Sequence, residues 1–132
     1  MSDPFEQQEW VKFGVAAALS KQYAADQREF LGLLAQMLEG ALPGEVEIAR
    51  KGGLFSKKTV QRATVTMGDY RYALEDPGRG PLLASRIRVV RGIALKTETI
   101  PVEEWLAELG AALDERAVKS AAAREALKRM IG

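Results

Sequence analysis

The sequence predicts an α+β fold in which helices at both ends of the chain cover one face of an antiparallel sheet. Three observations lead to this prediction. Apolar side chains recur every three or four residues before residue 40 and after residue 101, which is the period of a helix. Between these segments, apolar and polar residues alternate with the period of a strand. With 132 residues, the chain has the length of one domain, residues 1–132.

The N-terminal part is expected to form two helices, over about residues 4–24 and 27–39. A single straight helix over both would be about 54 Å long, whereas a domain of this size has a radius of gyration of only about 14 Å. Asp26 with Glu29 three residues later has the spacing of a helix start, so we place the break there.

The middle of the chain is expected to form a four-stranded antiparallel meander. Gly68 and Asp69 suit a two-residue type II′ turn, which pairs Met67 with Tyr70 and Val65 with Tyr72 on an apolar face. In the last and longest strand, Gly92 predicts a bulge or bend. The four predicted strands cover residues 45–48, 59–67, 70–75 and 83–98.

A long C-terminal helix is expected to begin at Pro101 and to continue to about residue 131, with Trp105 in its buried stripe. Gly110 is a candidate position for a kink. The alanine-rich second half buries little area by itself, so it needs a partner helix. That partner is the first helix of the same chain or of a second subunit, which leaves a homodimer through the terminal helices as an open alternative.

Composition excludes several classes of enzyme. The chain contains no cysteine and no histidine, so it lacks the thiolate nucleophile and the commonest general base and metal ligand. Two carboxylate pairs, Glu103 with Glu104 and Asp114 with Glu115, suit a helix start and an exposed helical stretch. We therefore expect a protein that is not an enzyme and that holds no cofactor and no metal.

The net charge of +1 hides an uneven distribution. Residues 50–96 carry 11 basic and 3 acidic side chains, whereas residues 1–49 carry 3 and 8, and residues 97–132 carry 5 and 7. The sequence therefore predicts a basic sheet between acidic helices. Clustered basic groups attract anionic partners, and arginine binds carboxylate or phosphate through paired hydrogen bonds.

The predicted partner-binding residues lie on the polar face of the sheet or at its end: Lys57, Lys58, Arg62, Arg71, Arg86 and Arg88. An acidic protein is the expected partner. Nucleic acid is the alternative, although Tyr70 and Tyr72 face the core and leave no aromatic residue for base stacking on the arginine face. A solvated face without a partner, with Arg62 paired to Glu75, is the third interpretation.

Two further expectations concern the loop before the second strand and the compartment. Leu54 and Phe55 are expected to fold back over the edge of the sheet, the alternative being contact with an anionic membrane or a partner. The acidic N-terminus has no apolar signal segment, so a cytoplasmic protein is expected. The order of helices, meander and helix resembles small bacterial adaptor and secretion-chaperone domains at the level of fold, and no motif carries a function with it.

Overall fold

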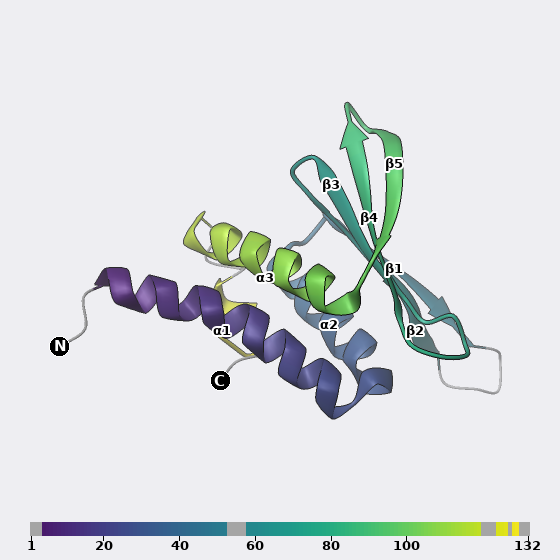
Figure 1. Cartoon of the computed structure of the whole chain (residues 1–132), viewed down its shortest axis with the longest axis horizontal. Coiled ribbons are helices and arrows are strands. Elements are labelled where there is room, and N and C mark those ends of the chain that lie inside the picture. The colour runs from purple at the N-terminus through teal and green to yellow at the C-terminus, as the bar shows by residue number, and fades with distance from the viewer. Residues whose placement is uncertain (1–3, 53–57, 120–123, 127, 130–132) are drawn as a thin grey trace.

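The computed structural model describes the backbone of residues 4–52, 58–119, 124–126 and 128–129, with side chains from residue 15 onward. Three helices lie on one side of a five-stranded antiparallel sheet, which leaves the opposite face of the sheet uncovered by the described helices (Figure 1). The predicted α+β class, with N-terminal helices and a long C-terminal helix, is therefore confirmed.

The two N-terminal helices are α1, Pro4–Ala25, and α2, Gln27–Ala41. Asp26 ends the first and caps the second, because its carboxylate accepts hydrogen bonds from the backbone N–H groups of Arg28 at 3.0 Å and Glu29 at 3.1 Å. The predicted break at this residue is confirmed.

The sheet has the strand order β1-β2-β3-β4-β5. Its second and third strands are joined at Gly68, whose φ of +62° is the value that a type II′ turn requires at its first central residue. The predicted register of this hairpin is confirmed, with Met67 opposite Tyr70 and Val65 opposite Tyr72. The strands are β1, Val46–Lys51; β2, Thr59–Met67; β3, Tyr70–Glu75; β4, Leu83–Val90; and β5, Ile93–Ile100.

The fifth strand is a correction to the sequence prediction. We expected one strand over residues 83–98 with a bend at Gly92, but Arg91 and Gly92 form a tight turn between β4 and β5. Their φ angles of +51° and +81° are both positive, as in the type I′ turn that joins two strands of a hairpin. Because the turn has only two residues, the alternation of apolar residues continues almost unbroken from β4 into β5. The sequence pattern of the two strands therefore resembles that of one long strand.

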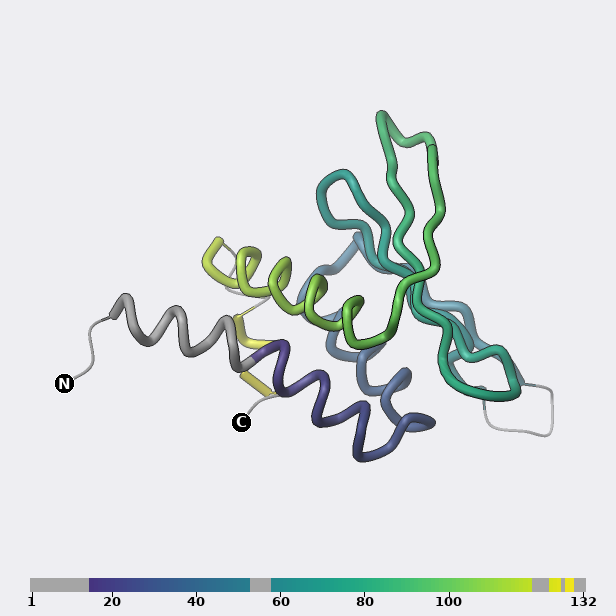
Figure 2. The backbone as a smooth tube through the Cα atoms, viewed as in Figure 1, coloured from purple at the N-terminus to yellow at the C-terminus, as the bar shows by residue number. Residues whose placement is uncertain are grey.

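The third helix, α3, covers Val102–Lys119 and packs along α1 (Figure 2). Residues 124–126 and 128–129 are helical as well. A Cβ atom on Gly110 would lie 3.0 Å from the Cα atom of Ala16, so this glycine permits close helix approach rather than a kink. The expected continuous helix to residue 131 is wrong. A Cβ atom on Gly40 in α2 would lie 3.6 Å from the Cβ atom of Ala126, so the chain has turned back by that point.

The core lies between the helices and the sheet. Trp105 is fully buried, as predicted, and its indole Nε1–H donates a 3.1 Å hydrogen bond to the backbone carbonyl of Ser85 in β4. This bond fixes the start of α3 against the sheet. Within the described part of the chain, no helix is long and apolar enough to cross a membrane.

Candidate interaction surfaces of the sheet

The cross-strand register shows which side chains share a face, because directly opposite residues in an antiparallel pair point the same way. Arg86 lies opposite Tyr72, and Arg88 lies opposite Tyr70, so both arginines belong to the face that the helices pack on. Arg62 and Arg71 belong to the uncovered face, which we call the open face. The prediction that the four arginines share one face is wrong.

The physical reason lies in the turn between β3 and β4. A shift of one residue in the pairing of a strand moves all of its side chains to the other face. The Gly68 turn fixes the pairing of β2 with β3, but the longer connection of residues 76–82 has no such unique geometry. The structure pairs Glu75 with Leu83, and this register places Arg86 and Arg88 beside the tyrosines.

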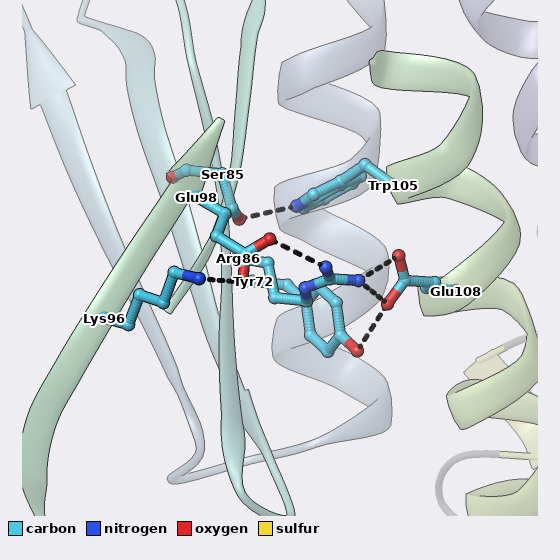
Figure 3. A network of polar contacts seen from close by, with 7 residues as sticks. All are labelled: Tyr72, Ser85, Arg86, Lys96, Glu98, Trp105 and Glu108. Atoms are coloured by element: carbon cyan, nitrogen blue, oxygen red, sulfur yellow. Dashed lines mark hydrogen bonds and ion pairs between the residues drawn. The ribbon is translucent and has the colours of Figure 1, made fainter. Parts of the chain in front are cut away.

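Arg86 lies at the centre of a network of polar contacts between the sheet and α3 (Figure 3). Its Nη1 atom donates to both carboxylate oxygens of Glu108 in α3, at 2.7 Å each. Its Nη2 atom donates to Glu98 in β5 at 3.1 Å, and the Tyr72 hydroxyl donates to Glu108 at 3.3 Å. We call the four residues Tyr72, Arg86, Glu98 and Glu108 the root network.

The root network holds its charges in place. Hydrogen bonds to Glu108 and then to Glu98 raise the pKa of Arg86, so its charge is permanent. Burial, followed by the negative charge of Glu108, raises the pKa of the Tyr72 hydroxyl above its ordinary value of 10.0. The Arg86 side chain is only 22% exposed. Arg86 therefore joins β4 to α3, and its Nη1 and Nη2 atoms donate to the two carboxylates rather than to solvent.

The open face has a hollow of about 740 Å³ over β1, β2 and β3. Arg62, Arg71, Thr64 and Thr66 line it, together with the carboxylate of Glu47. Both arginines are partly buried, and within the described residues neither forms an ion pair. The open face thus keeps two of the predicted arginines on one hollow, without an ion-pair partner among the described residues.

A third surface lies at the end of the β4–β5 hairpin, which projects beyond the helices (Figure 1). We call residues Arg88–Lys96 the hairpin tip. Val90, Ile93 and Leu95 in it are 40%, 64% and 60% exposed. This surface was not predicted from the sequence, because its residues were expected in one continuous strand with an apolar side. The signal that marks it is Arg91-Gly92, a pair that also suits a two-residue turn.

The remaining predicted site residues are the two lysines before β2. Lys58 is exposed one residue before β2 begins. Lys57 lies outside the described residues, as do Leu54 and Phe55, so their expected placement stays a prediction.

The carboxylate pairs differ from each other in burial. Glu103 and Glu104 are exposed in the first turn of α3, as expected for a helix start. Asp114 was expected to be exposed and is 2% exposed, whereas its neighbour Glu115 is exposed. The reason is helical spacing, since Asp114 lies four residues after Gly110 and three before Ala117, which are both buried. Among described residues, no three acidic side chains gather in the way that a metal site needs.

Comparisons with known proteins add no relative. No protein-family model, curated protein or solved structure matches the chain. The arrangement of these surfaces is therefore the basis for any statement about function.

Proposed function

We propose that the protein is a non-enzymatic interaction domain that binds an acidic protein partner through the open face of its sheet. The observation that supports this most is the position of Arg62 and Arg71. They line one hollow on the face that the described helices leave uncovered, and no ion pair within the described residues involves them. Arginines in this state keep their hydrogen-bond donors for a carboxylate from another molecule.

The chemistry of the hollow favours a few separate carboxylates over a continuous line of phosphates. The hydroxyls of Thr64 and Thr66 both donate and accept hydrogen bonds, so they suit the polar groups of a protein surface. The carboxylate of Glu47 repels an anion at one side of the hollow. A partner with acidic groups spaced to meet the arginines and avoid Glu47 fits this pattern.

Nucleic acid remains the alternative for the same face, and the aromatic residues argue against it. Proteins that read single strands on a sheet stack bases on exposed aromatic side chains. Tyr70 and Tyr72 lie on the opposite, helix-covered face. Among the described residues of the open face, the strand positions opposite Arg62, Thr64 and Arg71 are Glu75, Ala73 and Ile87, so no stacking platform is present there.

The test uses the full chain, tagged and expressed in the source organism, and quantifies captured proteins by mass spectrometry. Reversing both charges, Arg62→Glu with Arg71→Glu, should reduce enrichment of an acidic protein at least about tenfold, since desolvated charge pairs of this kind contribute several kcal/mol. The control, Lys21→Glu with Lys119→Glu, makes the same change of charge at two exposed helix positions. Equal enrichment with both double variants contradicts the proposal, and so does enrichment that nuclease treatment abolishes.

A further inference from the structure

We infer that the hairpin tip, Arg88–Lys96, is a second docking surface, which takes an acidic segment with apolar side chains from a partner protein. This inference rests on the proposed function in one respect, that the domain binds an acidic protein. It differs in the surface used, because the tip and the hollow of the open face share no residue. The two can therefore be tested separately.

The first observation is apolar exposure on a projecting element. Ile93 and Leu95 are 64% and 60% exposed, and Val90 is the direct cross-strand partner of Ile93. These residues belong to the end of the β4–β5 hairpin, and this end of the backbone projects away from the helices (Figure 2). Large aliphatic side chains that stand outside the core cluster, and that all fall within residues 90–95, are typical of a surface for another molecule.

The second observation is the sign of the charge around these side chains. Arg88, Arg91 and Lys96 all belong to the tip and are exposed, and residues 87–97 contain no acidic residue. Lys96 pairs with Glu98 at 3.7 Å, whereas Arg88 and Arg91 form no ion pair within the described residues. A second copy of the same hairpin would bring these two arginines against two others, which opposes self-association through the tip. The same charges attract an acidic segment, and they surround the apolar groups that would contact its apolar side chains.

The third observation limits how the segment binds. Strand β5 is an edge of the sheet, so one side of its backbone has free hydrogen-bonding groups. The pairing of Arg88 with Lys96 and of Val89 with Ala94 leaves Leu95 as an extra residue, which forms a bulge. A bulge interrupts regular strand addition. The segment therefore contacts the tip over a short length, with its affinity carried by side chains.

A peptide-display selection tests this inference, with the full chain as bait and random peptides of a dozen residues as the library. Enriched peptides should combine Asp or Glu with aliphatic or aromatic residues. One enriched peptide, made synthetically, should bind the chain at least tenfold more weakly after Ile93→Ser with Leu95→Ser. A change under twofold is expected for Leu33→Ser with Val118→Ser, which removes side chains that are 50% and 58% exposed elsewhere on the molecule.

Several results would overturn the inference. Selection without acidic enrichment is one, and equal affinity in the tip and control variants is another. Binding to vesicles of phosphatidylserine and phosphatidylcholine is a third such result, if it requires Ile93 and Leu95 and no acidic peptide binds. The tip would then contact a membrane and not a protein segment. The variant with Arg62→Glu and Arg71→Glu should keep its peptide affinity. If it loses that affinity while the tip variant keeps it, the open face is the peptide site.

Discussion

Arg86 and Arg88 lie two residues apart on β4 and point to the same face of the sheet, yet their surroundings differ. Arg86 is held by two carboxylates and is 22% exposed, whereas Arg88 is exposed and forms no ion pair within the described residues. The difference follows from the reach of α3, which contacts the sheet at Arg86 through Glu108 (Figure 3). Whether a basic side chain of this sheet is exposed depends on two things: the face of the sheet on which it lies, and whether a helix covers that part of the face.

Apolar side chains follow the same division. Beside the β4–β5 hairpin, Trp105 of α3 is fully buried and Tyr72 of β3, a member of the root network, is 7% exposed. Their rings meet edge to face with centroids 6.3 Å apart. At the tip, Ile93 is 64% exposed. The hairpin is thus packed against the core where it meets α3 and exposed at its tip.

The largest effect on stability is expected at Trp105, which packs beside Tyr72 of the root network. Trp105→Ala removes a fully buried ring and its hydrogen bond to Ser85, so the free energy of unfolding should fall by about 3–5 kcal/mol. Ile93→Ala at the tip should change it by less than about 0.5 kcal/mol. Urea unfolding followed by circular dichroism measures both. Similar losses in the two variants would remove the distinction between root and tip.

The second largest effect on stability is expected where α3 packs on α1. Gly110→Val places a branched side chain where even a Cβ atom lies 3.0 Å from Ala16, and it should destabilise the protein by about 2–3 kcal/mol. Ala111→Val introduces the same side chain at the exposed neighbouring position, where the lower helix propensity of valine should cost less than about 1 kcal/mol. Thermal unfolding compares the two. An equal cost at both positions would mean that close approach at Gly110 is unimportant.

A smaller effect is expected when the carboxylate of the root network is neutralised. Glu108→Gln removes the charge that accepts two 2.7 Å bonds from Arg86. Because the pair is partly exposed, we expect a loss of about 2 kcal/mol rather than the larger cost of a fully buried pair. Glu115→Gln, two helical turns along the same side of α3, is the control and should lie within about 0.5 kcal/mol of the parent protein. Chemical denaturation should separate them.

The smallest of these effects involves Tyr72 and appears at high pH. Burial and Glu108 raise its pKa above 10.0, so the folded protein holds the phenolic proton more tightly than the unfolded chain does. The stability this supplies is complete below about pH 10 and is lost as the pH rises through the folded-state pKa. Tyr72→Phe should cost about 1 kcal/mol at neutral pH. Its stability should then fall less steeply than that of the parent protein in alkaline solution. Parallel slopes would contradict the assignment.

Much of the fold was predictable from the sequence, because local chemistry determines it. The cap at Asp26, the turn at Gly68 and the buried stripe around Trp105 each depend on residues close together in the chain. The register of β4 depends instead on the seven-residue connection of residues 76–82. A connection of this length does not determine which β4 side chains face the helices and which face the other way. That is why the sequence could identify basic residues in the sheet but could not divide them between its two faces.

The candidate surfaces were less predictable for a related reason. Glu108 lies 22 residues from Arg86 in the sequence, and their contact exists only because α3 folds back onto β4. The hairpin tip depends on a positive φ at Arg91, which is uncommon for a residue with a side chain. Of the predicted partner residues, Arg62 and Arg71 share a hollow, Arg86 is part of the root network, and Arg88 belongs to the tip.

Whether α3 divides the hairpin into a structural root and a free tip is decided by comparing Arg86→Gln with Arg88→Gln in urea unfolding. The two substitutions are chemically identical and stand on one face of one strand. Arg86→Gln should lower the free energy of unfolding by about 2 kcal/mol, because it removes the ion-pair partner of Glu108 and leaves Glu98 with only Lys96. Arg88→Gln should lower it by less than about 0.5 kcal/mol. Equal losses in the two variants would contradict this division.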